Sequence, residues 1–78
     1  MTAKFELAGA LAFTNDDDFI VFDPEAREPI PYTRDGAFIF VADEFADRFA
    51  VMRFSVPASI KARPEEWAEC KRRALKGY

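Results

Sequence analysis

The sequence predicts an α+β fold, in which a small antiparallel sheet of about three to four strands packs against a C-terminal helix. Short apolar runs rich in β-forming residues occupy positions 19–22 and 37–41, and turn-forming residues bound each run. A helical pattern that starts with a proline and stops at a glycine covers positions 64–77. The 78 residues suffice for one hydrophobic core, so we expect a single domain over residues 1–78.

The N-terminal part of the chain is expected to form two strands. The first is indicated by apolar residues on alternate positions, namely Phe5, Leu7, Leu11 and Phe13. This is the period of a half-buried strand, although the intervening alanines would also tolerate a helix. After a polar break, Phe19–Phe22 is a continuous apolar run, typical of a short buried strand, that Asp23 and Pro24 end.

The middle of the chain predicts a hairpin followed by a mixed segment. Ile30–Thr33 extends the chain again, with Pro29 and Pro31 keeping it off a central sheet position because proline cannot donate to the hydrogen-bond ladder. Turn chemistry around Asp35 and Gly36 predicts a hairpin that leads into the next apolar strand. Residues 43–54 combine helical spacing with a strand-like run, which favours a short helical turn entering a strand and allows a second short helix near residues 43–49.

The clearest element is the C-terminal helix. Pro64 suits its first position, glutamates follow in the first turn, and basic residues gather near its end, where they complement the helix dipole. Trp67, Cys70 or Lys71, and Ala74 have the spacing of one helical face. We therefore expect Trp67 to pack inward and the basic side chains to face water.

Charge is divided unevenly along the chain. Residues 1–47 carry eleven acidic and three basic side chains, a net charge of −8. Residues 48–78 carry eight basic and three acidic side chains, a net charge of +5, so that the whole chain has a formal charge of −3. A folded domain can bring the two halves together so that they cancel, or it can segregate them into two faces with different partners.

The chain lacks the residue sets that support common catalytic and metal sites. It has no histidine, which removes the commonest general base and the mixed zinc sites, and Cys70 is its only cysteine. The acidic run at residues 15–18 lacks the glycine and the ligand spacing of a calcium loop, so we interpret it as a solvated loop. We therefore expect no enzymatic activity, no cofactor and no bound metal.

The sequence also predicts where the protein resides. No apolar stretch is long enough to span a membrane, and the N-terminus lacks the apolar core and cleavage signature of a signal peptide. A lone cysteine cannot form an intramolecular disulfide, which fits a reducing compartment. These features predict a cytoplasmic protein without membrane association.

The acidic side chains cluster in predicted turns, which lie at the surface of folded proteins. If the topology brings several turns to one end, they form a negative patch able to dock on a basic surface, including one that normally holds nucleic acid. The prediction is a module that binds a protein or ribonucleoprotein complex with a basic surface, as a monomer or a weak dimer. The predicted partner-binding residues are Asp16, Asp17, Asp18, Asp23, Glu25, Glu28, Asp35, Asp43, Glu44 and Asp47.

Two other functions stay open at this point. A nucleic-acid-binding accessory protein would contact phosphates through the basic helix, although the overall negative charge argues against direct nucleic-acid binding as the main role. The side chains for that role are Lys71, Arg72, Arg73 and Lys76. A self-associating assembly subunit would instead use an open edge of the Phe-rich strands.

Phe38 and Phe40 resemble the alternate aromatic rings that stack on bases in RNA-binding sheets. The order of elements differs from that module, however, and acidic residues flank the segment. We therefore expect both rings to lie on the inward face of a buried strand.

In size, acidity, aromatic content and absence of catalytic groups, the chain resembles the small phage-encoded inhibitors of bacterial immunity known as anti-CRISPR proteins. The resemblance covers the whole chain as a class and assigns a role to no single residue. It implies an inhibitor in the cytoplasm of a bacterial host, whose acidic surface blocks the DNA-binding face of an RNA-guided complex. The turn acids named above would form that surface.

Overall fold

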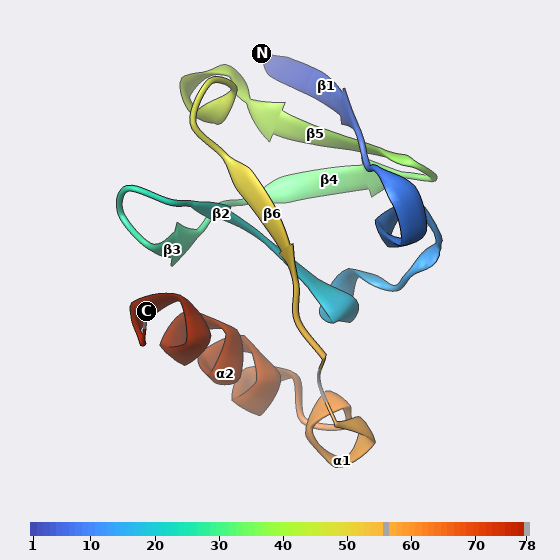
Figure 1. The fold of residues 1–78 in the computed structure, drawn as a ribbon, viewed down its shortest axis with the longest axis vertical. Helices are drawn as coiled ribbons and strands as arrows, with labels where there is room; N and C mark the ends of the chain where they lie inside the picture. The colour runs from blue at the N-terminus through green and yellow to red at the C-terminus, as the bar shows by residue number, and fades with distance from the viewer. Residues whose placement is uncertain (56, 78) are drawn as a thin grey trace.

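The computed structural model describes residues 1–55 and 57–77, and it places the strands of this part of the chain in two three-stranded antiparallel sheets with a C-terminal helix beside them (Figure 1). The predicted α+β class is confirmed. The strands form two sheets instead of one, and an apolar face of each sheet covers that of the other.

The first sheet has the order β1-β5-β4 and contains the predicted hairpin. Its strands are β1 (Thr2–Glu6), β5 (Phe38–Ala42) and β4 (Tyr32–Asp35). β4 and β5 are antiparallel, and Asp35 pairs with Phe38 across a tight turn. Gly36 opens this turn with a φ of 60°, a conformation that a side chain would strain. The predicted hairpin around Asp35 and Gly36 is confirmed.

The second sheet has the order β3-β2-β6, with the predicted buried strand at its centre. β2 (Phe19–Asp23) pairs with β3 (Glu28–Pro29) on one side and with β6 (Ala50–Arg53) on the other. Pro29 therefore lies in an edge strand, as its missing N–H group requires. A 3-10 turn, η3 (Asp43–Phe45), precedes β6, which confirms the predicted helical turn entering a strand.

The hydrophobic core lies between the two sheets. Ile39 and Val41 of β5 and Phe19 and Val21 of β2 are each no more than 2% exposed and belong to one cluster. Burial of such side chains stabilises a fold by about 1.5–3 kcal/mol each. Two sheets that share these residues therefore hold the protein together without a disulfide.

Phe38 and Phe40 lie on the opposite face of β5 and are half-buried, so the prediction that both rings face inward is wrong. The pairing with β1 decides the face: Lys4 lies opposite Phe40, and Glu6 lies opposite Phe38. A face that carries these charges has to meet water. The Lys4 ammonium lies 4.2 Å from the centroid of the Phe38 ring and covers part of it.

The first strand is shorter than the alternating pattern predicts. β1 ends at Glu6, and a 3-10 turn, η1 (Gly9–Phe13), follows, so a strand over residues 5–13 is wrong beyond Glu6. Gly9 has a φ of 58°, which turns the chain away from the sheet. Leu7, directly after β1, and Leu11, in the turn, still pack on the core. Their spacing therefore reflects packing and not an extended backbone.

Two helices close the chain, and only the second was predicted. α1 (Ala58–Lys61) is a single turn after Pro57, too short to leave a periodic apolar pattern. α2 (Pro64–Lys76) confirms the predicted C-terminal helix. Within the described part of the chain, neither helix has the length and the apolar content needed to cross a membrane.

α2 packs through the predicted face of Trp67 and Lys71, but the residues that it buries most are not the predicted ones. Leu75 and Lys71 are the residues that this helix buries, at 3% and 8% exposure, whereas Trp67 is half-buried. The expectation that the basic side chains of the helix face water is therefore wrong at Lys71. Its long aliphatic chain lies along the protein, and only its amino group needs a polar partner.

Candidate functional site

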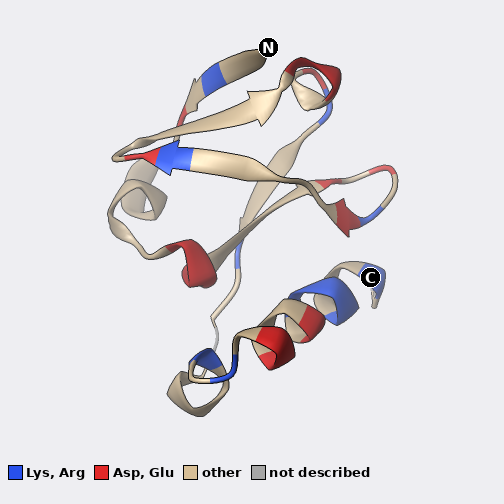
Figure 2. Cartoon of the chain, turned by 180° about the vertical axis from the view of Figure 1, so that it is seen from behind, with Lys and Arg blue, Asp and Glu red and all other residues tan. Residues whose placement is uncertain are grey.

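Acidic side chains gather at one end of the two sheets. Phe22 of β2 lies opposite Ala50 of β6, which brings the turn after β2 next to the segment before β6. Both carry exposed carboxylates, and Figure 2 shows the two acidic turns at the same edge of the molecule. We call this surface the acidic end; it consists of Glu25, Glu28, Asp43, Glu44 and Asp47.

Asp23 joins the two turns from beneath this surface. One carboxylate oxygen accepts hydrogen bonds from the backbone N–H groups of Glu25 at 2.9 Å and Ala26 at 3.3 Å, which fixes the turn after β2. The other oxygen lies 3.3 Å from Nε of Arg48, in the turn before β6. Asp23 is only 7% exposed, so the expectation that all turn acids lie at the surface is wrong here. It organises the acidic end and does not form part of its surface.

Positive charges also lie near the acidic end, because the basic C-terminal half of α2 packs beside β3 (Figure 2). Arg48 is bound to Asp23, and Arg27 is exposed with a φ of 56°, in the left-handed region that non-glycine residues rarely adopt. Among residues 1–55 and 57–77, no ion pair involves any of the five carboxylates of the acidic end. Their charges therefore add to a negative field that faces the solvent.

The acidic run Asp16–Asp18 lies at the other end of β2, where basic side chains neutralise it. Oδ1 of Asp16 is 2.9 Å from Nη1 of Arg34, and Nζ of Lys61 is 2.9 Å from Asp18 and 3.7 Å from Asp17. The hydrogen bond from Lys61 holds the pKa of Asp18 below its usual value of 3.8, and the same bond raises the pKa of Lys61. These three acids therefore serve the fold, and they stand apart from the acidic end.

Arg34 fixes this region, and sequence reasoning missed it. Its guanidinium group donates hydrogen bonds to the backbone carbonyls of Gly36 at 2.8 Å, Ala12 at 2.9 Å and Thr14, besides its pair with Asp16. Only 15% of its side chain is exposed. An arginine beside a turn has no sequence signal for this role, because the carbonyls of Ala12 and Thr14 belong to a distant segment.

Asp35 also lies apart from the acidic end. It is exposed at the end of β4, beside the hairpin turn that Figure 2 shows on the opposite side of the molecule from η3. The structure thus brings five of the ten predicted acids together. The pairing of β2 with β6, which has no local signature in the sequence, decides which five.

The basic side chains of α2 do not form one positive surface. Lys71 is buried, and Arg72 and Arg73 share the carboxylate of Glu69 at 3.0 and 3.5 Å. Lys76 is exposed, and no ion pair of the described residues includes it. Phosphate contacts would therefore have to compete with Glu69 for two of the four predicted cations.

Within the described ranges, 1–55 and 57–77, no three potential metal ligands of the His, Cys, Asp and Glu types come together. Comparison with known proteins finds no family model that matches the chain, no similar curated protein and no similar solved structure.

Proposed function

We propose that the protein is a non-enzymatic binding module whose acidic end docks on a positively charged surface of a protein or ribonucleoprotein complex. The observation that supports this best is the gathering of five exposed carboxylates at one end, while Asp16, Asp18 and Asp23 are each paired with a basic side chain. Unpaired like charges repel one another and do not stabilise a fold. A basic partner surface relieves that repulsion and accelerates the encounter.

The partner surface in this proposal is one that ordinarily binds nucleic acid. Such surfaces hold phosphates with lysine and arginine side chains. The carboxylates of the acidic end offer the same sign of charge to those cations. Docking then excludes nucleic acid from the partner, which is the inhibitory mechanism that the resemblance to anti-CRISPR proteins implies.

The test compares two triple variants that change the net charge equally. Both replace exposed carboxylates with neutral amides, so neither removes a side chain that is ion-paired among the described residues. The first variant combines Glu25→Gln, Glu44→Gln and Asp47→Asn at the acidic end; the control combines Glu6→Gln, Asp35→Asn and Glu65→Gln elsewhere.

Each immobilised protein is exposed to bacterial cytoplasmic extract, and the retained proteins are identified by mass spectrometry. We expect the wild type and the control to retain nucleic-acid-binding proteins that added DNA displaces. The acidic-end variant should bind them about tenfold more weakly, because each lost exposed ion pair contributes about 0.5 kcal/mol. Equal retention by the two variants, or retention that DNA does not displace, contradicts the proposal.

A further inference from the structure

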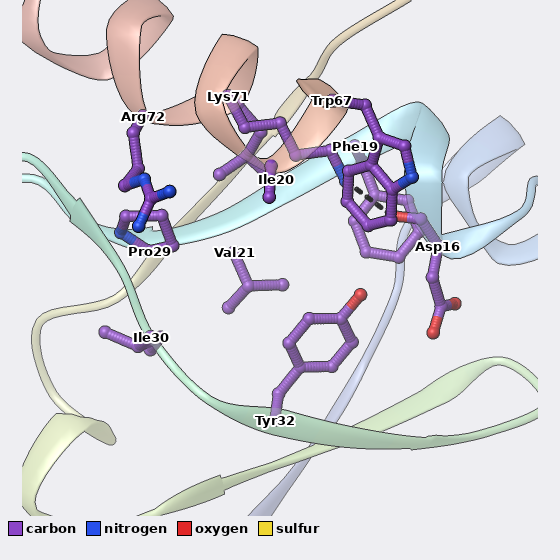
Figure 3. A pocket seen from close by; sticks show the side chains of 11 residues that line it. Asp16, Phe19, Ile20, Val21, Pro29, Ile30, Tyr32, Trp67, Lys71 and Arg72 are labelled. Carbon is purple, nitrogen blue, oxygen red and sulfur yellow. Dashed lines mark hydrogen bonds between the residues drawn. The ribbon is translucent and has the colours of Figure 1, made fainter. Parts of the chain in front are cut away.

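A hollow of about 450 Å³ lies between α2, the central strand β2 and the segment that leads from β3 into β4. Its walls are mostly apolar: Phe19, Tyr32 and Trp67 form an aromatic side, and Ile20, Val21 and Ile30 form an aliphatic side (Figure 3). The volume falls within the range of about 300–1,000 Å³ that small-molecule sites occupy. This hollow is separate from the acidic end and plays no part in the proposed docking.

Two hydrogen-bond donors converge on the aromatic side of the hollow, which Asp16 also lines. Nζ of Lys71 lies 4.2 Å from the centroid of the Trp67 ring and donates a hydrogen bond of 3.1 Å to the backbone carbonyl of Asp16. Figure 3 shows the Tyr32 hydroxyl pointing into the hollow from the opposite wall. Burial raises the pKa of Tyr32 to about 12, and the nearby carboxylate of Asp16 adds to the rise, so this hydroxyl is neutral and can donate a hydrogen bond at physiological pH.

The Lys71 amino group is only partly satisfied where it lies. An ammonium group has three N–H donors, and within the described residues one of them has a hydrogen-bond acceptor. Burial lowers the pKa of Lys71, because taking the ammonium out of water disfavours its charged form. The carboxylates of Asp16, Asp17 and Asp18 oppose this shift, but they already form ion pairs with Arg34 or Lys61. An anion placed beside Lys71 would restore the interactions that burial removes. Arg72, which is ion-paired with Glu69, also lines the hollow.

We propose that this hollow binds a small amphipathic carboxylate with an aromatic or branched apolar body. The body fills the space between Trp67 and the aliphatic wall, where it replaces water against apolar side chains. The carboxylate accepts hydrogen bonds from Lys71 and from the Tyr32 hydroxyl.

The protein carries its own reporter for this site, because Trp67 is the only tryptophan of the chain and lines the hollow. Fluorescence of Trp67, excited at a wavelength that simple phenyl groups do not absorb, can be followed while 4-phenylbutanoate is added to the full-length protein. The matched neutral probe is 4-phenyl-1-butanol, which has the same apolar body without the charge. We expect saturable binding of the carboxylate, about tenfold tighter than that of the alcohol, which corresponds to one charge-assisted interaction.

Two variants of α2 test the charge of Lys71 and the volume of the hollow separately. Lys71→Met keeps the length of the side chain and should abolish the preference for the carboxylate, whereas the exposed control Lys76→Met should leave it unchanged. Ala68→Phe places a ring into the hollow and should weaken both probes at least tenfold. Circular dichroism establishes whether each variant is folded. If Lys71→Met does not fold, Ala68→Phe still tests the site independently.

Three outcomes would overturn the proposal. The first is that neither probe changes the Trp67 signal saturably. The second is that the alcohol binds the wild type as tightly as the carboxylate, or that Lys71→Met keeps the preference. The third is a dimer by sedimentation that Ala68→Phe converts to a monomer, which would mean that a second copy of the chain occupies the hollow.

Discussion

A single guanidinium group, that of Arg34, ties the N-terminal turn to the β4–β5 hairpin through backbone carbonyls of both segments. Arg34→Lys keeps the charge, but an ammonium group cannot reach the carbonyls of Ala12, Thr14 and Gly36 together. We expect the free energy of unfolding in urea to fall by about 2 kcal/mol, because partly buried acceptors lose their donors. Arg72→Lys, at an exposed site, should change it by less than about 0.5 kcal/mol, and an equal loss in both variants would contradict the role given to Arg34.

The bond between Asp18 and Lys61 makes stability depend on pH at both extremes. The pKa of Asp18 is lowered from 3.8 in the folded protein, so its contribution is complete above that value and is lost as the pH falls through the folded pKa. The pKa of Lys61 is raised from 10.5, so its contribution is complete below that value and is lost as the pH rises through the folded pKa. The pair therefore stabilises the fold across the whole range between these limits.

Asp18→Asn tests this dependence. Urea denaturation at neutral pH should show a less stable protein, since Lys61 loses its closest carboxylate. As the pH falls below 3.8, the difference from the wild type should shrink, because the wild type also loses the carboxylate charge. Asp35→Asn, in an exposed residue, serves as the control. A difference between wild type and Asp18→Asn that stays constant down to pH 2 would show that the charge of Asp18 is not what stabilises the fold.

At the level of elements, sequence patterns predict well where a segment has one strong local signal. The run Phe19–Phe22, the turn at Gly36 and the proline-to-glycine limits of α2 each appear in the structure as predicted. Predictions fail where the local pattern fits both faces of a strand equally well. Every residue of the 37–41 run is apolar, so its alternation could not say that Ile39 faces the core; only the register with β1 decides this.

The grouping of the acidic side chains could not be predicted from local sequence patterns either. Turn chemistry places the acids in loops, but their grouping depends on which strands pair. β2–β6 pairing puts Glu25 and Asp47 at one end, whereas Asp16 and Asp35 fall at the other. Lys61 and Arg34 neutralise Asp16–Asp18 from distant positions in the chain. Such long-range pairs have no local signature, so composition and turn patterns alone overestimate the size of the acidic surface.

The whole molecule consists of three layers, and the helix is packed less tightly than the two sheets. The two sheets share a continuous apolar core, and four of the five residues of β2 are buried. α2 lies beside the second sheet, on the side away from the first (Figure 1), and it buries only Lys71 and Leu75 across a hollow of about 450 Å³. Local unfolding begins where few apolar side chains are buried. The helix should therefore open more readily than the sheets.

Hydrogen exchange tests this order directly. Amides of α2 should exchange faster than amides of β2 and β5, because the helix can detach without disrupting the core between the sheets. Leu75→Ala removes the one large apolar side chain that α2 fully buries, so it should accelerate exchange in α2 and leave β2 and β5 nearly unchanged. Ala74→Ser, which changes a small and only partly buried side chain of the same helical turn, is the matched control. If Leu75→Ala accelerates exchange in all three elements by the same factor, the helix and the sheets unfold as one unit and the layers are equally cohesive.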